Sequence, residues 1–525
     1  MSPRRASYPG TSPGANSVKN PGHPRKVWRA RRPPEAALKI LFVASECAPY
    51  AKVGGLGDVV AALPKTLRRM GHDARILMPL YASIRRDLHG IRFLQSCGVH
   101  MGNNEEHWVG VYEAELDNEV PVWLVDYQRF FGRPGIYDEP GGEYGDNAFR
   151  FALLSKAALQ VCKDVNFIPD VMHAHDWPTA LVPVFLKTWD RILSPLSATA
   201  SVLTIHNIGY QGVYHISAFP YIGVGWEHYT PDKFEDHGKV NLLKAGLSFT
   251  DAVTTVSPAH AREILTPEGG MGLAPYLNAR RGDVTGILNG ADYDHWNPAK
   301  DRLIPERYAP ENLSGKAACK QALQQQLGLA VRPDWPVFGV VSRLAPQKGL
   351  GLLAEALPAA LPQMIFQVVI LGTGDPGLEQ VFRGLAGSWR DRVACHIGFS
   401  NELSHWIEAG SDFFLMPSLY EPCGLNQMYS MKYGTLPVVR AIGGLDDTVE
   451  NYNEATGAGT GFKFWHPGAQ ALKDTMGWAV ATWFDRPAHI EQMRRAAMRK
   501  DFSWERSAAE YVAVYRRAIA ARRAG

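Results

Sequence analysis

The sequence lacks the features of a secreted, membrane-spanning or zinc-binding protein. Its six cysteines lie far apart and include no Cys-x-x-Cys pair. Neither a zinc site nor a disulfide framework is therefore predicted, and a reducing, cytoplasmic compartment is favoured. No apolar run reaches the ~18 residues that indicate a membrane span, so no membrane association is expected. The first 37 residues contain no continuous apolar segment, which argues against a secretory signal.

Acidic residues are almost missing from residues 1–37, where eight Lys and Arg stand against Glu35 alone. Removing these from the totals of 55 basic and 52 acidic residues leaves 47 and 51. This slightly acidic remainder gives no electrostatic case for a nucleic-acid partner. The abundance of Pro, Gly, Ser and Arg predicts a disordered basic extension over 1–37. Its prolines and its missing amphipathic pattern argue against the alternative, an organelle transit peptide.

Two catalytic signatures are also absent. The glycines after the first expected strand, 38–44, do not form the dinucleotide fingerprint G-x-G-x-x-G, which disfavours a nicotinamide dehydrogenase. No close pair of carboxylates resembles that of a double-displacement glycosidase.

The most informative stretch that is present is 342–349. The apolar run 337–341 predicts a buried strand, and Pro346 predicts the start of a helix. Arg343 and Lys348 can then converge on one anion at the positive end of that helix, an arrangement that suits a diphosphate. The alternative is a solvated turn with two surface cations.

A second strand–turn–helix unit follows residues 38–44. Lys52 precedes the glycines Gly54 and Gly55, Asp58 begins the expected helix, and that helix extends over 59–70. Glycines in such a turn allow a phosphate or a sugar to approach the backbone closely, although a glycine pair is often only a turn.

The alternation of apolar runs with helical segments predicts an α/β fold with two similarly built halves. We expect a first domain over 38–287, whose last strand is 251–257, and a second domain over 288–500. Residues 501–525 predict an amphipathic helix whose apolar face requires a partner.

Polar side chains follow several predicted strands, at the edge where open parallel sheets bind ligands. His175 and His206 are functional candidates, whereas His173 is expected to be a satisfied core histidine. No nearby carboxylate or cysteine completes a metal set around His173 and His175, so no metal is predicted. Glu421 can accept bonds from sugar hydroxyls, although an acid there also complements a helix dipole.

Two aromatic residues are further candidates. Tyr144 and Asp146 lie in the glycine-rich loop 141–147 and offer stacking and hydrogen bonding to a sugar ring, unless the loop merely turns the chain. Phe399 follows a predicted strand and is either a core residue or a stacking platform for a base.

Six motifs occur in one order across about 38–500. They are Lys52–Asp58, His175–Trp177, Thr204–Asn207, Ser342–Gly349, Glu421–Leu425 and Gly443–Asp446. This series resembles the motifs of bacterial glycogen synthases and plant starch synthases.

The resemblance implies a GT-B glycosyltransferase with two Rossmann-like doubly wound domains facing across a cleft. It implies transfer of glucose from ADP-glucose to the non-reducing end of an α-1,4-glucan such as glycogen, with retention of configuration and without a cofactor. It also implies that the last helix crosses back to the first domain. A retaining GT-B transferase with another nucleotide-sugar donor or a small-molecule or lipid-linked acceptor is the alternative. A catalytically silent glucan-binding scaffold is disfavoured by the intact Arg343, Lys348, His206 and Glu421.

The resemblance also assigns site residues, one position at a time. The catalytic group comprises His206, Arg343, Lys348 and Glu421. The ADP-glucose contacts comprise Lys52, Gly54, Gly55, Asp58, Asn289, Phe399, Cys423, Gly424, Leu425 and Gly444. The acceptor-side group comprises Tyr144, His175 and Asp176.

Two positions depart from related patterns. The wider retaining GT-B group often has a second Glu eight residues after the first, where this chain has Tyr429. Glycogen synthases generally share that lack, so it favours them. Val53 replaces the Thr of many bacterial members, a variation also seen among starch synthases.

Overall fold

The protein is described from a computed structural model that covers residues 36–139 and 142–524. The extension predicted over 1–37 lies almost wholly outside these residues, as does Gly141. Within the described ranges, no helix combines the length and apolar character needed to cross a bilayer.

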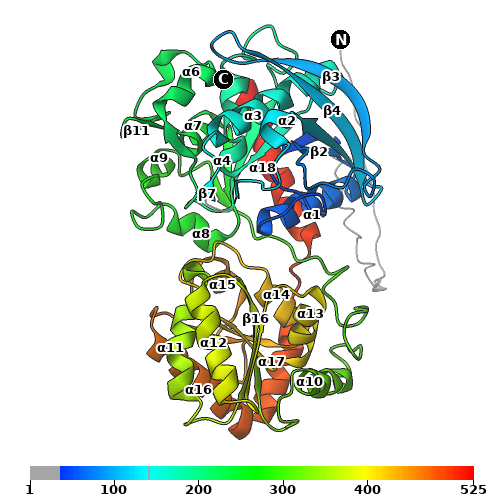
Figure 1. Ribbon diagram of the computed structural model, residues 1–525, viewed down its shortest axis with the longest axis vertical. Helices are drawn as coiled ribbons and strands as arrows, with labels where there is room; N and C mark the ends of the chain where they lie inside the picture. The colour runs from blue at the N-terminus through cyan, green and yellow to red at the C-terminus, as the bar shows by residue number, and fades with distance from the viewer. Residues whose placement is uncertain (1–35, 140–141, 525) are drawn as a thin grey trace, which may run out of the picture. The chain divides into compact units, whose positions relative to one another are not determined.

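The first half of the chain is built on a mixed nine-stranded sheet (Figure 1). Across the sheet the strands are β14 (Val284–Gly286), β13 (Ala252–Thr255), β9 (Ala200–Ile205), β8 (Val171–His175), β1 (Lys39–Val43), β2 (Asp73–Pro79), β5 (Val120–Asp126), β4 (Glu106–Leu116) and β3 (Arg92–His100). Neighbours from β14 to β5 are parallel, and β4 is antiparallel to both β5 and β3.

The parallel strands were predictable because helices cover both of their faces. The strands β8 and β9 are buried at every position, and such strands read as continuous apolar runs. The strands β3 and β4 were missed: β3 has no buried residue in its first half, and β4 largely alternates buried residues with exposed or half-buried ones. The prediction that 251–257 holds the last strand of this half was wrong, because β14 pairs with β13. A three-residue edge strand is too short to produce a recognisable pattern.

Helices and short strands complete this half. The helices are α1 (Gly55–Arg69), α2 (Gln128–Phe131), α3 (Asn147–Asp164), α4 (Asp176–Thr179), α5 (Leu181–Lys187), α6 (Phe219–Ile222), α7 (Leu242–Phe249), α8 (Pro258–Glu263), α9 (Ala274–Ala279), η1 (Ile216–Ala218) and η2 (Trp226–His228). The short strands are β6 (Asp138–Glu139), β7 (Gly142–Glu143), β10 (Val213–His215), β11 (Glu235–Asp236) and β12 (Lys239–Asn241).

The second half contains a wholly parallel six-stranded sheet. Its order is β17 (Val393–Ile397), β16 (Gln367–Gly372), β15 (Val337–Val341), β18 (Phe413–Met416), β19 (Leu436–Arg440) and β20 (Phe462–Phe464). Its helices are α10 (Ser314–Gln326), η3 (Pro346–Lys348), α11 (Leu350–Ala360), α12 (Pro376–Ser388), α13 (Asn401–Gly410), α14 (Asn426–Lys432), α15 (Gly443–Thr448), α16 (Ala469–Asp485) and α17 (Pro487–Met498).

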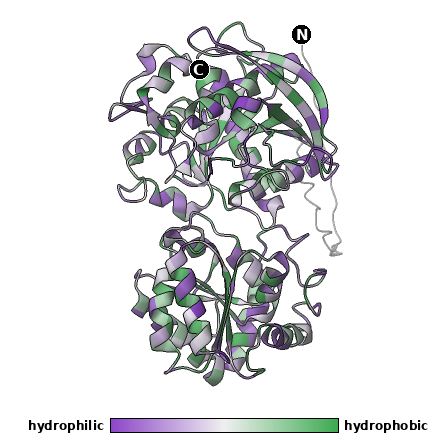
Figure 2. Ribbon diagram, viewed as in Figure 1, coloured by the Kyte–Doolittle hydropathy of each residue, from purple (hydrophilic) through white to green (hydrophobic). Residues whose placement is uncertain are grey.

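These helices form two layers around the second sheet. Figure 1 shows α11, α12 and α16 on one side of it and α10, α13 and α14 on the other. In Figure 2 the strands between these layers are predominantly hydrophobic, in agreement with their burial.

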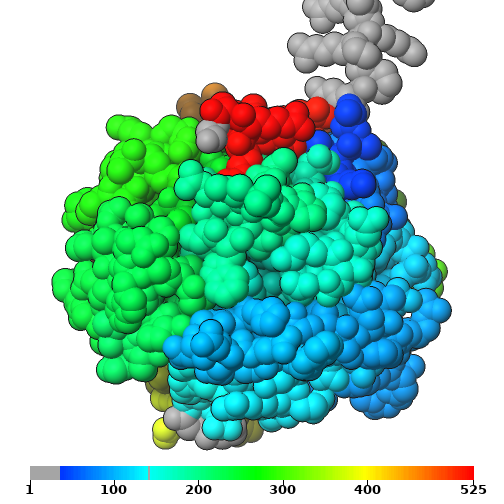
Figure 3. Space-filling model, turned by 90° about the horizontal axis from the view of Figure 1, so that it is seen from above, coloured from blue at the N-terminus to red at the C-terminus, as the bar shows by residue number. Residues whose placement is uncertain are grey.

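The last helix, α18 (Trp504–Ala524), packs on the first sheet. Trp504, Tyr511 and Tyr515 are buried, and the helix contacts α1, β8, β9 and β13. Figure 3 shows its end at the surface, next to segments from the first half of the chain. The apolar face predicted for this segment is therefore covered.

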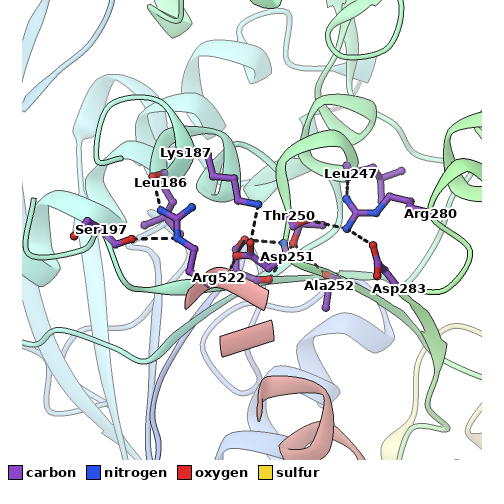
Figure 4. A network of polar contacts seen from close by, with 11 residues as sticks. Leu186, Lys187, Ser197, Leu247, Thr250, Asp251, Ala252, Arg280, Asp283 and Arg522 are labelled. Carbon is purple, nitrogen blue, oxygen red and sulfur yellow. Dashed lines mark hydrogen bonds and ion pairs between the residues drawn. The ribbon is translucent and has the colours of Figure 1, made fainter. Parts of the chain in front are cut away.

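A polar network anchors the end of α18 (Figure 4). Arg522 donates hydrogen bonds to the carbonyl oxygens of Ser197, at 3.1 Å, and Leu186, at 3.3 Å. Leu186 lies in the last turn of α5, where a cation complements the helix dipole. Close by, Asp251 pairs with Lys187 at 2.6 Å and accepts from the backbone N–H of Ser201 at 2.8 Å.

A buried carboxylate joins three elements of the second half. Asp412 pairs with Lys320 of α10 at 2.7 Å, accepts from the Val337 N–H of β15 at 2.9 Å and pairs with Arg494 of α17. Charge pairing and hydrogen bonds hold the pKa of Asp412 below its ordinary value, against the opposing effect of burial.

We expect Asp412→Ala to lower the free energy of unfolding by about 3–5 kcal/mol, because it leaves two buried cations unpaired. Urea unfolding at pH 7 measures this loss. The difference from wild type should shrink as the pH falls below about 4, where the unfolded carboxylate and then the folded one bind a proton. The exposed pair of Arg92 and Glu113 supplies the control, since Glu113→Ala should cost under about 1 kcal/mol.

Candidate active site

The turn that carries Lys348 differs from the prediction of a helix starting at Pro346. Pro346–Lys348 form a 3₁₀ turn, Gly349 has a φ of +65°, and α11 begins at Leu350. A Cβ atom on Gly349 would stand 1.9 Å from the carbonyl oxygen of Pro417. Glycine is required both by this contact and by the left-handed backbone, and it allows the turn to lie against the segment 417–421.

This close approach brings together Lys348 and Glu421. Lys348 Nζ lies 2.7 Å from Glu421 Oε2, and Ser418 Oγ donates to the same oxygen at 3.0 Å. The Glu421 side chain is 7% exposed and that of Lys348 is 22% exposed. Glu421 Oε1 has no hydrogen bond within the described residues, so one carboxylate oxygen remains available to a ligand.

Arg343 lines the same pocket as Lys348 and Glu421. It is exposed, and its guanidinium forms neither a hydrogen bond nor an ion pair with any described residue. The pocket walls also include Gly424 and Leu425. Two cations therefore face one pocket, and one of them has no competing carboxylate.

The segment around Cys423 contributes backbone rather than side-chain chemistry. Gly444 N–H donates to the Glu421 carbonyl at 3.2 Å, and a Cβ on Gly444 would stand 2.1 Å from the Cys423 carbonyl oxygen. Burial raises the pKa of the Cys423 thiol to about 12, which leaves no nucleophilic thiolate at neutral pH.

The glycine turn near Lys52 is held by a carboxylate that the sequence analysis did not consider. Glu46 Oε2 accepts from the backbone N–H groups of Val53, at 2.7 Å, and Gly54, at 3.0 Å, while Tyr137 donates to Oε1 at 2.7 Å. A Cβ on Gly54 or Gly55 would meet nothing within 4 Å. Internal packing does not require these glycines, and the space beside them is open to a ligand.

Lys52 itself pairs with Asp58 at 2.7 Å, and both side chains are substantially exposed. Within the described residues, no hydrogen bond or ion pair joins this pair to Arg343, Lys348 or Glu421.

His206 and Asp176 lie beside β8 and β9. Asp176 Oδ1 accepts from the backbone N–H groups of His206, at 2.7 Å, and Asn207, at 3.3 Å, and its own φ is +55°. Burial raises the pKa of Asp176 to about 7 and lowers that of His206 to about 3. His175 is fully buried, with Nδ1 3.0 Å from His206 Nε2.

Both halves of the chain match known protein families. The starch synthase catalytic domain family covers residues 39–279, and the glycosyl transferases group 1 family covers 335–477. Glycogen synthase 1 of Geobacter metallireducens is 47% identical over 92% of this chain and 96% of its own. The glycogen synthase of Treponema denticola is 47% identical over 92% of this chain and 99% of its own. The chain belongs to the glycogen and starch synthase family.

A solved structure supports the same assignment. The catalytic domain of starch synthase IV from Arabidopsis thaliana, bound to ADP and acarbose, has a TM-score of 0.84 and 34% identity, covering 92% of this chain and 100% of that one. A sucrose-phosphate synthase from Thermosynechococcus elongatus, at 18% identity and a TM-score of 0.57, shares the fold. The predicted GT-B class is confirmed. As a member of the glycogen and starch synthase family, the present chain is a glucosyltransferase.

Three of the predicted site residues differ from one another in burial and in their contacts. Phe399 is 89% exposed after β17, which excludes a core role. The backbone N–H of Asn289 reaches the Cys423 thiol, while its buried Oδ1 has no partner among the described residues. Tyr144 is buried, with its ring 4.8 Å from the guanidinium groups of both Arg133 and Arg150.

Two further contacts of the site escaped the sequence analysis. Tyr420, next to Glu421, has its hydroxyl 3.0 Å from His260 Nε2 of α8, and Glu263 of α8 accepts from the Gly443 N–H at 2.8 Å. Neither carries a sequence signal, because each partner is more than a hundred residues away. Glu46 does have a usable signal, since it is an acid that closely follows the strand before a glycine turn.

We expect Lys348→Ala to lower turnover by at least ~10²-fold, the effect of removing one group that stabilises transition-state charge. Glucose transfer at saturating donor measures this change, and circular dichroism should show a retained fold. Lys300→Ala, which breaks an exposed ion pair with Asp294, is the matched control and should keep normal turnover. Near-normal turnover of the Lys348 variant would contradict its role.

We expect Glu46→Ala to raise the KM for the sugar donor by about tenfold or more, because two backbone N–H groups lose a charged acceptor, each bond being worth about 1.5–3 kcal/mol. Glu46→Gln retains an oxygen acceptor and should have a smaller effect. An unchanged KM in the alanine variant, in an otherwise folded protein, would show that the turn does not depend on Glu46.

Proposed function

We propose that this protein is a hexosyltransferase that moves glucose from ADP-glucose to the non-reducing end of an α-1,4-glucan such as glycogen, with retention of configuration. The pocket that joins Arg343, Lys348 and Glu421 carries the proposal. The ADP and acarbose bound to the Arabidopsis relative support this choice of donor and acceptor.

The two cations suit the departing nucleotide diphosphate. As the bond to the anomeric carbon breaks, negative charge grows on the phosphate and positive charge grows on the sugar. At ~4 Å and an effective dielectric near 20, each cation–phosphate pairing contributes about 4 kcal/mol before desolvation is subtracted. Arg343 has no ion pair to give up within the described residues, whereas Lys348 shares its charge with Glu421. Arg343 is therefore assigned the more direct contact.

Glu421 is assigned to the hydroxyls of the transferred glucose. Lys348 and Ser418 both contact Oε2, so Oε1 is left to accept a bond from a sugar hydroxyl. His206, partly exposed at the end of β9, is assigned to the same glucose and shields the developing cation.

The remaining donor contacts are proposed from the same resemblance. The open space beside Gly54 and Gly55 supports their assignment to the diphosphate and glucose, and the exposure of Phe399 supports its assignment to the adenine. The other assigned donor contacts are Lys52, Asp58, Asn289, Cys423, Gly424, Leu425 and Gly444. Cys423 acts through its backbone in this proposal.

The acceptor is assigned to the first half of the chain. Tyr144, His175 and Asp176 are proposed on this side, with Tyr144 and His175 acting from buried positions. The domains proposed are 38–287 for the acceptor, 288–500 for the donor and 501–525 as the helix that returns to the first domain. The six free thiols support a cytoplasmic location.

The test is glucose incorporation into glycogen from ADP-glucose and UDP-glucose, side by side and without added metal. We expect strong incorporation from ADP-glucose. Incorporation from UDP-glucose alone would overturn the adenine assignment of Phe399. No incorporation from either would favour a GT-B transferase with another acceptor.

A further inference from the structure

Two neutral imidazoles meet where the strands β8 and β9 end. His175 Nδ1 lies 3.0 Å from His206 Nε2. Burial holds the pKa of His206 at about 3 and that of His175 well below its usual range, so both rings are neutral at pH 7. A neutral imidazole has one N–H donor and one bare nitrogen, so a single proton lies between the two rings.

Two arrangements satisfy this contact. In the first, His175 donates from Nδ1 and His206 carries its own proton on Nδ1. In the second, His206 donates from Nε2 and His175 carries its proton on Nε2. In the first arrangement His175 Nε2 is a bare nitrogen, and in the second it carries a proton. This nitrogen is buried and has no hydrogen-bond partner among the described residues.

The rings around His175 offer no acceptor for an N–H at that position. Phe42 stacks on His175 at 15° between ring planes, and His173 lies 4.2 Å away at 35°. Both rings face the plane of His175, whereas its N–H would point along that plane. An orphaned buried N–H is rarer than an unfilled acceptor, and this disfavours the second arrangement.

The neighbouring histidine shows what a fully partnered ring requires here. His173 Nδ1 lies 2.9 Å from the Tyr515 hydroxyl, and its Nε2 lies 2.6 Å from Thr204 Oγ1. His175 has only His206, so the direction of one hydrogen bond fixes the tautomers of both rings.

We infer that His175 is a positioning residue: by donating from Nδ1 it fixes His206 as the Nδ1–H tautomer, so that His206 presents a hydrogen-bond donor to the sugar. Within the described residues His206 Nδ1 has no hydrogen-bond partner, and the side chain is partly exposed. The consequence for turnover rests on the proposed function, whereas the tautomer itself does not.

The direct test is ¹⁵N NMR of the full-length protein labelled at histidine, with the His206 signals assigned by their loss in His206→Asn. We expect the shift of a protonated nitrogen at Nδ1 and that of a bare nitrogen at Nε2. A proton on Nε2, or an even mixture of tautomers, would overturn the inference. This readout needs no substrate, so it remains decisive even if ADP-glucose proves not to be the donor.

Substitutions at His175 test the effect on catalysis. His175→Phe fills similar volume without a donor; we expect His206 to lose its preference for Nδ1–H and kcat to fall about ten- to a hundredfold, while KM changes little. His175→Asn places an amide donor near the position of Nδ1 and should recover most of the loss. A kcat for His175→Phe as high as that for His175→Asn would contradict the inference.

Tyr515→Phe is the matched control, because it removes a hydrogen bond from His173 and leaves the contact between His175 and His206 in place. We expect an unchanged His206 tautomer and unchanged kcat. If His175→Phe does not fold, the wild-type NMR measurement decides alone.

Discussion

Lys348 and Glu421 are 73 residues apart in sequence, yet their charged atoms lie 2.7 Å apart, in the segments that follow β15 and β18 of the second sheet. Their meeting depends on Gly349, whose positive φ and missing Cβ let the turn after β15 lie on the carbonyl of Pro417. Gly443 and Gly444 pack equally close to the backbone of Glu421 and Cys423. The pocket is thus built by backbone contacts that only glycine allows, and the two charged side chains are then set by one short ion pair.

In the first half, burial sets the ionisation of the candidate site residues. Its polar site residues lie at or near the ends of buried parallel strands, and burial there acts on their ionisation. His206 and His175 are held neutral, and the pKa of Asp176 is raised to about 7. In the proposed reaction a neutral His206 adds no like-charge repulsion to the developing sugar cation. Asp176 accepts from the backbone N–H groups of His206 and Asn207. The pocket of the second half therefore contains the cations Arg343 and Lys348, whereas His206 and His175 of the first half are neutral groups.

Much of this arrangement was visible in the sequence. The buried parallel strands read as apolar runs, and the loops after them carried Arg343, Lys348, His206 and Glu421. The strands β3 and β4 and the short edge strand β14 were missed because they contain no continuous buried apolar run. Tyr420 and Glu263 were missed for another reason, since each contacts a partner more than a hundred residues away that sequence spacing does not indicate.

The sequence by itself determined the fold class, the family and the kinds of side chain at the site, because apolar periodicity and ordered motifs are local properties. Only the tertiary structure decided that Glu421 keeps one oxygen unpaired, that Cys423 is too buried to be a nucleophile, and that His175 faces His206. Ionisation, tautomer and hydrogen-bond partner depend on distance and burial, and these arise when strands and loops from distant parts of the chain pack together.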